Sequence, residues 1–375
     1  MKFTIERSIF LKSLSRVQGV VERRATVPIL ANIYLETRQT GLELRATDMD
    51  LEISETVFCE IERTGSATAP AYMVYDIMRK LPENARVNLE HYPEESQLVL
   101  CSGKSKFILK SLPVTDFPAL VESTLPISFK VRAIDLRSLI ERTRFAMSTE
   151  ATRYYLNGIY LYAVHNAGVG VLRAIATDGY RLALAEVSLP KDAYNMPSVI
   201  LPRKTVEELR TLIEETTTEI TTSLSNTKIR FAFGQNTILI SKLIDGTFPD
   251  CERVIPVNNN KTIEVNAKAL AEAVSRVSTV MATDKARAVK LEVVRDSLVL
   301  SASNTTTNNN ATDELDAVCD CTPLSIGFNS RYLLDILGQM TGDTVRFAVS
   351  DPSSPMMVRE VADDSALYIL MPMRV

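Results

Sequence analysis

Three stretches of the sequence repeat one another at nearly equal spacing, and this repeat constrains the fold more than any single residue does. Leu44-Arg45-Ala46-Thr47-Asp48 is matched by Ile175-Ala176-Thr177-Asp178, and Ala46 and Ala176 lie 130 positions apart. A fainter third copy is Leu300-Ser301-Ala302-Ser303-Asn304. The repeating unit is far longer than a solenoid repeat, so each copy can bury a core of its own. The chain is therefore expected to fold as one domain used three times.

The same order of elements is predicted in every third of the chain. Apolar residues recur at three-and-four spacing in 9–21, 134–147 and 270–281, which indicates one amphipathic helix per third. A second, shorter helix is predicted to begin near Tyr72, Arg203 or Arg331. Runs that alternate apolar and polar residues indicate sheets with one buried face, so the fold class is α+β with antiparallel strands. In the first third the predicted strands are 33–36, 41–47, 51–57, 85–90, 97–101 and 106–112.

The predicted domains are 1–122, 130–255 and 256–375, joined by linkers near 121–129 and 256–263. The polar run 304–312 is predicted to be a flexible loop, because it lacks the apolar residues that would hold it down.

Composition indicates an ordinary globular protein of the cytosol. No apolar run approaches the length that crosses a bilayer, and charges interrupt the first seven residues where a secretory signal would be apolar. The five cysteines are odd in number and lack CxxC spacing, which favours reduced thiols. Cys319 and Cys321 could be half of a metal site, but His91 and His165 are not at ligand spacing, so no metal or other cofactor is expected.

Sequence signals of catalysis are missing. There is no GxxxxGK[ST] loop and no GxGxxG motif that follows a strand and opens a helix, and two histidines leave little room for a nucleophile–histidine pair. Asp48-Met49-Asp50 could hold Mg²⁺, but its repeat partner Asp178-Gly179-Tyr180 keeps only the first carboxylate. Asp48 and Asp178 are instead predicted to close turns through their own backbone. We do not expect an enzyme.

Several motifs along the chain occur in an order that resembles one known family. They are Thr26-Val27-Pro28-Ile29-Leu30, Arg153-Tyr154-Tyr155-Leu156-Asn157-Gly158, Ala176-Thr177-Asp178-Gly179-Tyr180-Arg181-Leu182, Pro202-Arg203-Lys204, Phe248-Pro249-Asp250 and Met371-Pro372-Met373-Arg374. Together they closely resemble the bacterial DNA polymerase III beta subunit family, the replicative sliding clamps. The resemblance implies three clamp-type domains in a ring-shaped head-to-tail homodimer, with helices lining a central hole and sheets outside. It also implies a processivity factor without catalysis, working on DNA in the cytoplasm at the nucleoid and not at a membrane.

Elementary geometry agrees with a ring of two chains. A compact domain of one third of the chain has a radius of gyration of about 14 Å, and a sphere of that size is roughly 36 Å across. Six such spheres in a ring leave a hole about 36 Å wide, whereas three leave about 6 Å, against a duplex about 20 Å across. One chain is too small to encircle DNA, and two chains are large enough.

A ring that slides should offer diffuse positive charge and should not read bases. The chain carries a net charge of −4, yet the helical windows 8–24, 133–147 and 267–281 hold nine Lys or Arg against four Asp or Glu. A solvated helix face is the ordinary alternative for such an excess. The basic residues that fit a lining are Lys12, Arg16, Arg24, Arg137, Arg142, Arg144 and Arg276. By the resemblance, the residues closest to DNA are Arg24, Tyr154, Tyr155, Arg203, Lys204 and Arg253.

Two departures from the family weaken the expected contact with DNA. Tyr72 and Met73 stand where clamps often have basic residues, and Glu150 stands where a neutral polar residue would suit DNA better. Direct affinity is therefore expected to be low, and retention on DNA to depend on encirclement.

The resemblance also implies one pocket for short linear motifs of the replicative polymerase alpha subunit, the clamp loader, other DNA polymerases and repair proteins. Leucine, valine, proline and methionine make an adaptable apolar surface. Without the resemblance, Met371 and Met373 would be interpreted as core residues of a terminal strand. The implied lining is Arg153, Tyr155, Leu156, Thr177, Gly179, Tyr180, Leu182, Pro249, Arg253, Val254, Tyr332, Ser353, Ile369, Met371, Pro372, Met373 and Arg374.

For the dimer interface, Phe107, Ile108 and Leu109 of one copy are expected to meet Val280 and Met281 of another. Lys104 and Lys106 are expected to face Asp313 and Glu314, although exposed ion pairs contribute less than about 1 kcal/mol each. A scaffold that binds peptides without enclosing DNA is the main alternative to a clamp, and an enzyme with a disguised site is the least favoured.

Overall fold

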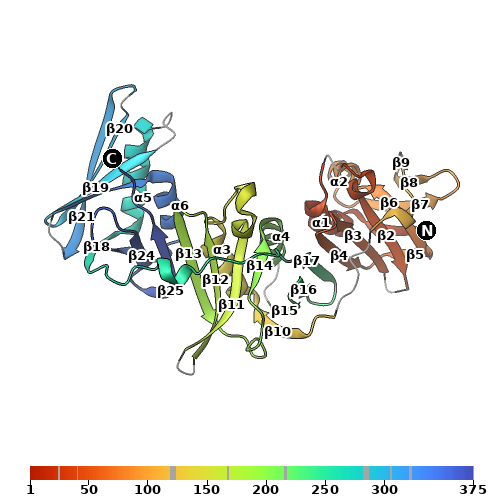
Figure 1. Cartoon of the computed structure of the whole chain (residues 1–375). Helices are drawn as coiled ribbons and strands as arrows, with labels where there is room; N and C mark the ends of the chain where they lie inside the picture. The colour runs from red at the N-terminus through yellow and green to blue at the C-terminus, as the bar shows by residue number, and fades with distance from the viewer. Residues whose placement is uncertain are drawn as a thin grey trace. The chain divides into compact units, whose positions relative to one another are not determined.

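The computed structural model describes residues 1–23, 26–39, 41–118, 124–166, 169–214, 218–281, 287–304, 306–320 and 323–374 (Figure 1). The chain divides into two compact units, which are described separately below. Unit 1 comprises Met1–Arg137, Pro190–Pro197 and Lys204–Leu243, and unit 2 comprises Ser138–Leu189, Ser198–Arg203 and Ile244–Val375. The central third of the sequence therefore contributes to both units.

Each third of the chain supplies two α-helices to the described structure. The first of each pair buries one face at the predicted spacing: Phe10, Leu14 and Val17 are buried in α1. None of the helices in the described ranges is long and apolar enough to span a membrane. The helices are α1 (Arg7–Val17), α2 (Ala71–Lys80), α3 (Ala133–Arg144), α4 (Arg203–Glu214), α5 (Ala267–Ser278) and α6 (Ser330–Leu337). The 3-10 helices are η1 (Gln18–Val20), η2 (Pro28–Ala31), η3 (Val114–Asp116), η4 (Ala151–Leu156), η5 (Cys251–Val254) and η6 (Thr279–Met281).

Unit 1 contains two antiparallel sheets. The five-stranded sheet has the order β5 (Glu60–Arg63), β1 (Lys2–Glu6), β7 (Arg86–Tyr92), β8 (Gln97–Ser102) and β9 (Ser105–Lys110). The eight-stranded sheet has the order β10 (Ile127–Arg132), β15 (Glu219–Leu224), β16 (Lys228–Phe233), β17 (Thr237–Lys242), β4 (Leu51–Val57), β3 (Gly41–Thr47), β2 (Asn32–Arg38) and β6 (Gly65–Pro70).

Unit 2 is built on a single antiparallel sheet of twelve strands. Its first half has the order β14 (Val199–Pro202), β11 (Gly158–Asn166), β12 (Val169–Thr177), β13 (Arg181–Ser188), β25 (Asp363–Leu370) and β24 (Met356–Glu360). Its second half has the order β23 (Thr344–Val349), β18 (Lys261–Asn266), β21 (Asn309–Asp320), β20 (Ser297–Asn304), β19 (Ala288–Val294) and β22 (Leu324–Asn329).

The predicted α+β repeat is confirmed, with helices and antiparallel sheets in each third. The prediction omitted the strand that opens each third, although Phe3 and Ile5 of β1 are buried and alternate with polar residues. The prediction of a flexible loop over 304–312 was wrong at Asn304, the last residue of β20, and at 309–312. Residues 309–312 form the start of β21, where Asn309 pairs with Asn304 and Asn310 with Ser303. Cross-strand pairing orders this segment, so apolar side chains were not needed.

The first and central thirds are joined in unit 1 by main-chain pairing. Strand β4 pairs with β17, which aligns Ile53 with Leu239 and makes one sheet of strands from both thirds. The side chain of Lys204 on α4 crosses the same joint. Its Nζ donates to the Val20 carbonyl oxygen at 2.8 Å and to Asp48 Oδ2 at 2.5 Å. The joint therefore combines a continuous sheet with a cation held by two acceptors.

One carboxyl group at this joint, that of Glu208, is buried and has a shifted pKa. Glu208 of α4 lies so close to Gly19 that no side chain could be added at Gly19 without moving the carboxylate. Burial raises the pKa of Glu208 to about 7, with Glu207 and Asp48 acting in the same direction and Lys204 opposing them. The folded chain therefore binds a proton at Glu208 over a pH range in which an unfolded chain releases it.

We expect Glu208 to make folding stability fall as pH rises from about 4.5 to 7, because the deprotonated carboxylate is disfavoured only in the folded state. In Glu208→Gln this contribution should disappear. The free energy of unfolding of the wild type relative to Glu208→Gln should drop by about 2 kcal/mol between pH 5 and pH 8. Urea unfolding at several pH values measures the difference, and parallel curves for the two proteins would contradict the expectation.

Candidate functional site

The turn between β12 and β13 is built by its own side chains. Asp178 Oδ1 accepts from the backbone N–H groups of Tyr180 and Arg181 at 3.0 Å each. Thr177 Oγ1 donates to the Arg181 carbonyl oxygen at 2.7 Å. Asp48 Oδ1 accepts from two N–H groups in the matching turn of the first third, which confirms the prediction that these aspartates close turns. The turn leaves Tyr180 54% exposed.

The end of the chain runs beside this turn. Strand β13 pairs with β25, the last strand of the third domain, so that Leu182 lies opposite Ile369. Beyond β25, the Met371 N–H donates to the Tyr180 carbonyl oxygen at 2.9 Å, and the Met373 N–H donates to the Gly327 carbonyl oxygen at 2.8 Å. Main-chain bonds therefore tie residues of the central third to residues of the last third at this turn.

Most residues of the implied partner pocket gather around this pairing in unit 2. Leu156, Leu182 and Ile369 are buried in one apolar cluster together with Phe248, which precedes Pro249, and Cys251, which begins η5. Tyr155 packs against that cluster, and Met371 and Val254 are 37% and 45% exposed. The structure thus provides an apolar floor with exposed apolar side chains near it.

Two clefts are lined in part by residues of the implied pocket. One, of about 590 Å³, is lined by Ser353, Pro372, Met373 and Arg374 together with Lys290 and β22. The other, of about 320 Å³, is more polar and contains Tyr180 and Tyr332, whose rings stack with centroids 6.3 Å apart. Arg153 reaches toward the turn, with Nη1 3.4 Å from the Asp178 carbonyl oxygen.

Arg181 is the residue at this site that the sequence analysis did not single out. Its side chain is 9% exposed and forms an ion pair with Asp335 of α6 at 2.5 Å. Its guanidinium also lies 4.4 Å from the centre of the Tyr332 ring. Asp335 is 154 residues away in the sequence, so no local pattern could have indicated the pair.

Several of the residues implied to contact DNA already form hydrogen bonds or ion pairs with other groups of the same chain. Arg24 lies outside the described residues. Arg203 donates to the carbonyl oxygens of Met147 and Ser148 at 2.8 Å each, and Lys204 holds the joint described above. Arg253 is 85% exposed at its side chain but pairs with Asp250 at 2.7 Å. Tyr154 is 53% exposed, and its ring meets the edge of the Tyr155 ring.

Three of the basic residues predicted to line the hole occupy the same helical position in each third. Each of them is paired with a carboxylate, so the expectation of free positive charge does not hold at these positions. Two of the carboxylates lie on the strand that packs beneath the helix, and the third comes from the last strand of the next third. The pairs are Arg16–Glu55 at 2.6 Å, Arg276–Asp313 at 2.8 Å and Arg142–Asp363 at 2.6 Å. Arg144 also pairs with Glu141, at 2.9 Å.

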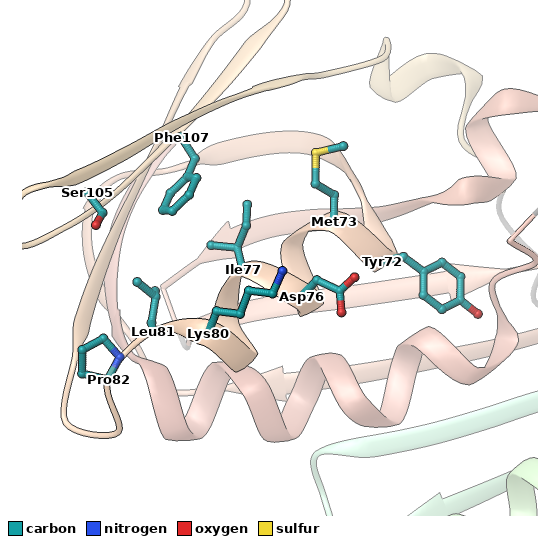
Figure 2. Close-up of a pocket in the computed structure, with 9 residues that line it drawn as sticks. All are labelled: Tyr72, Met73, Asp76, Ile77, Lys80, Leu81, Pro82, Ser105 and Phe107. Atoms are coloured by element: carbon teal, nitrogen blue, oxygen red, sulfur yellow. The ribbon is translucent and has the colours of Figure 1, made fainter.

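The implied dimer residues are placed unequally. Ile108 on β9 is 57% exposed, whereas Leu109 is 5% exposed and Met281 is 3% exposed, so those two side chains belong to the core of their own third. Val280 is half-buried, and Asp313 is already paired with Arg276. Figure 2 shows Phe107 facing Ile77 and Met73 of α2 across a cleft of about 650 Å³.

Thiol and metal chemistry find little support in the described ranges. Cys59 and Cys251 are buried, and burial raises the pKa of each thiol to about 11. No group of three His, Cys, Asp or Glu residues within those ranges is placed to hold a metal ion. Cys321, half of the considered metal pair, lies outside them.

Comparison with known proteins covers almost the whole chain. The family models of the DNA polymerase III beta subunit match at residues 1–121 for the N-terminal domain, 130–250 for the central domain and 252–374 for the C-terminal domain. The beta sliding clamps of Caulobacter vibrioides and Pseudomonas putida are 45% and 38% identical over 375 residues, which span both chains fully.

Solved structures agree with the sequence matches. The DNA polymerase sliding clamp from Caulobacter crescentus superposes with a TM-score of 0.94 at 45% identity, and both chains are covered fully. The DnaN sliding clamp from Bartonella birtlesii bound to griselimycin superposes with a TM-score of 0.96 at 45% identity, again over both full chains.

Three copies of one helix-and-sheet domain, matched along their full length, define a DNA sliding clamp. The chain belongs to the bacterial DNA polymerase III beta subunit family, the beta sliding clamps. It is a processivity factor rather than an enzyme, and the family form is a ring-shaped dimer with DNA and polymerase partners.

We expect Gly179→Ala to disturb the turn that carries Tyr180. Gly179 has a φ of +90°, a conformation that strains an L-residue, and an added Cβ would lie 2.9 Å from Arg153 Nη1. The variant should lose about 1–2 kcal/mol of unfolding free energy in a thermal or urea titration. Gly103→Ala is a control at an exposed positive-φ glycine with open space around it. Equal losses in both variants would show that Arg153 adds nothing to the constraint.

Proposed function

We propose that two copies of this chain close head to tail into a ring around duplex DNA of any sequence, and that the ring tethers proteins through the pocket at the end of β25. The observation that carries the proposal is that the two internal joints share one design, and that the two halves of a third such joint are left at opposite ends of the chain. The cytoplasm, at the nucleoid, is the corresponding location.

The shared design is an antiparallel strand pair. At each internal joint the last strand of one third pairs with a middle strand of the third before it: β17 with β4, and β25 with β13. Strand β9 is the last strand of the first third and ends its sheet. Strand β21 holds the place of β4 and β13 in the last third. Over its residues 309–316 it pairs with β20, and the described strands supply no partner on its other side.

Helix α2 also has an exposed residue at a position that is buried in the matching helix α4. Met73 and Ile77 are the third and seventh residues of α2, and the same positions of α4 are Thr205 and Leu209, which are 1% and 0% exposed. Met73 is 52% exposed and faces the cleft with Phe107 (Figure 2). Covering unpaired edges and apolar faces is favourable, and a second copy arranged by twofold symmetry covers both ends at once.

The ion pairs of the arginines predicted to line the hole lower the direct affinity that we expect for DNA. Arg16, Arg142 and Arg276 each pair with a carboxylate, so these three cations are less available to displace counterions from the phosphates. Encirclement does not depend on counterion release, so it can retain the protein on DNA where direct affinity does not.

We expect clamp loaded on closed circular DNA to remain bound through a wash in 1 M salt and to be lost once the circle is linearised, because only a closed ring is topologically linked. Gel filtration of the protein–DNA mixture before and after cutting measures the retained fraction. Loss from circles and linear DNA at the same rate would instead favour a scaffold that does not enclose DNA.

The pocket is proposed to bind short linear motifs of the polymerase alpha subunit, the clamp loader, other DNA polymerases and repair proteins. Its apolar floor is rigid, because Leu156, Leu182 and Ile369 belong to the buried cluster. Met371 and Met373 lie at the surface on backbone that is hydrogen-bonded at both residues, so their flexible side chains can adapt to different ligands.

Met371→Ala combined with Met373→Ala should weaken binding of a polymerase alpha-subunit motif peptide at least tenfold, because the apolar area that contacts the peptide is removed. The dimer should persist in analytical ultracentrifugation. Fluorescence anisotropy measures the affinity, and Met49→Ala, an exposed methionine in the matching turn of the first third, should leave it unchanged. An unaltered affinity in the double variant would remove the pocket assignment.

A further inference from the structure

Arg181 lies beneath the pocket surface and binds three elements at once. It is the first residue of β13, directly after the turn that carries Tyr180. Its Nε donates to Asp178 Oδ2 at 3.0 Å, and its Nη1 donates to Asp335 Oδ2 on α6 at 2.5 Å. Its Nη2 donates to the Phe145 carbonyl oxygen, just past the end of α3, at 2.7 Å. Each of its three guanidinium nitrogens therefore donates to an acceptor within the protein.

The same guanidinium supports an aromatic wall. It lies 4.4 Å from the centre of the Tyr332 ring and 5.1 Å from that of Phe145, both within the range of a cation–π contact. Tyr332 in turn stacks on Tyr180, with ring planes 23° apart. Contacts therefore run from a cation with 9% exposure, through Tyr332, to the exposed ring of Tyr180.

The other internal joint shows that such a joint forms without this arginine. Leu51 stands in the first third where Arg181 stands in the second, three residues after the turn aspartate in each case. Glu208 matches Asp335 by its place in the helix, and no arginine pairs with it among the described residues. Strands β4 and β17 still pair over five residues, as β13 and β25 do. What the second joint has in addition is the stacked tyrosine pair at the pocket.

We propose that Arg181 is a positioning residue of the partner pocket: it does not touch the bound segment, but holds Tyr332 and Tyr180 as one wall against which an apolar side chain of that segment packs. The inference rests on the proposed function of the pocket. It predicts that loss of Arg181 weakens partner binding only as long as the tyrosine wall is present.

The test is a double-mutant cycle on the full-length protein, with a labelled polymerase alpha-subunit motif peptide as the probe. Arg181→Gln should weaken peptide binding about tenfold. Tyr180→Ala should weaken it to a similar degree, and adding Arg181→Gln to Tyr180→Ala should change the affinity less than twofold. Full additivity of the two losses would overturn the proposal, because it would show that Arg181 acts independently of the wall.

Arg142→Gln is the matched control, because Arg142 also ties the central third to β25 through Asp363 and Ser365 but does not contact the tyrosines. Its peptide affinity should stay within twofold of the wild type even if its thermal stability falls as far as that of Arg181→Gln. An equal loss of affinity in both variants would reduce Arg181 to a general stabiliser of the joint and would overturn the inference.

A spectroscopic signal separates positioning from stability. The chain has no tryptophan, so Tyr180→Trp places a single reporter on the wall. Its fluorescence anisotropy at low temperature should fall when Arg181→Gln is added and should not fall with Arg142→Gln. Arg181→Lys keeps the charge but loses the flat guanidinium, so it should restore thermal stability more than peptide affinity.

These outcomes also separate this inference from the proposed function. If Met371→Ala with Met373→Ala abolishes peptide binding and Arg181→Gln leaves it unchanged in a folded protein, the pocket stands and the positioning role is wrong. If the methionine variant binds the peptide normally, the pocket assignment fails, and the inference fails with it.

Discussion

Antiparallel pairing between the last strand of one third and a middle strand of the third before it is the interaction on which the rest of the structure depends. At the joint of β13 with β25 it brings Leu182 opposite Ile369 and leaves the Met371 N–H free to bond the Tyr180 carbonyl oxygen. Main-chain hydrogen bonds set this register, so the strand pairing itself brings the residues of the implied pocket together. The same kind of pairing joins β4 to β17.

The strand pairing between thirds also explains which carboxylate the arginine of each first helix meets. In the first and last thirds, the arginine of the first helix meets an acid on the strand beneath it, as Arg16 meets Glu55. In the central third that strand carries Ala185 instead, and Arg142 reaches Asp363 on the strand supplied by the next third. Arg142, which could otherwise contact DNA, thus binds a carboxylate at the joint. This agrees with a protein that is held on DNA by encirclement.

The repeat, the helices and the turn aspartates were predictable because each is a local property. Apolar spacing places α1, α3 and α5 close to where they occur, and Asp48 and Asp178 close turns with N–H groups two and three residues away. The errors also have local causes. The segment 309–312 looks too polar to be ordered, yet it is held by a partner strand whose effect its own residues do not reveal.

At the site, the sequence by itself determined which side chains are present and which short motifs carry them, because those motifs keep their order along the chain. It did not determine what each side chain does. Arg181 pairs with Asp335, and Arg142 with Asp363, only because pairing of β13 with β25 brings together residues more than 150 positions apart. The raised pKa of Glu208 likewise follows from its burial against Gly19. Burial and long-range charge pairing depend on the environment that the folded chain creates, so only the tertiary structure decided them.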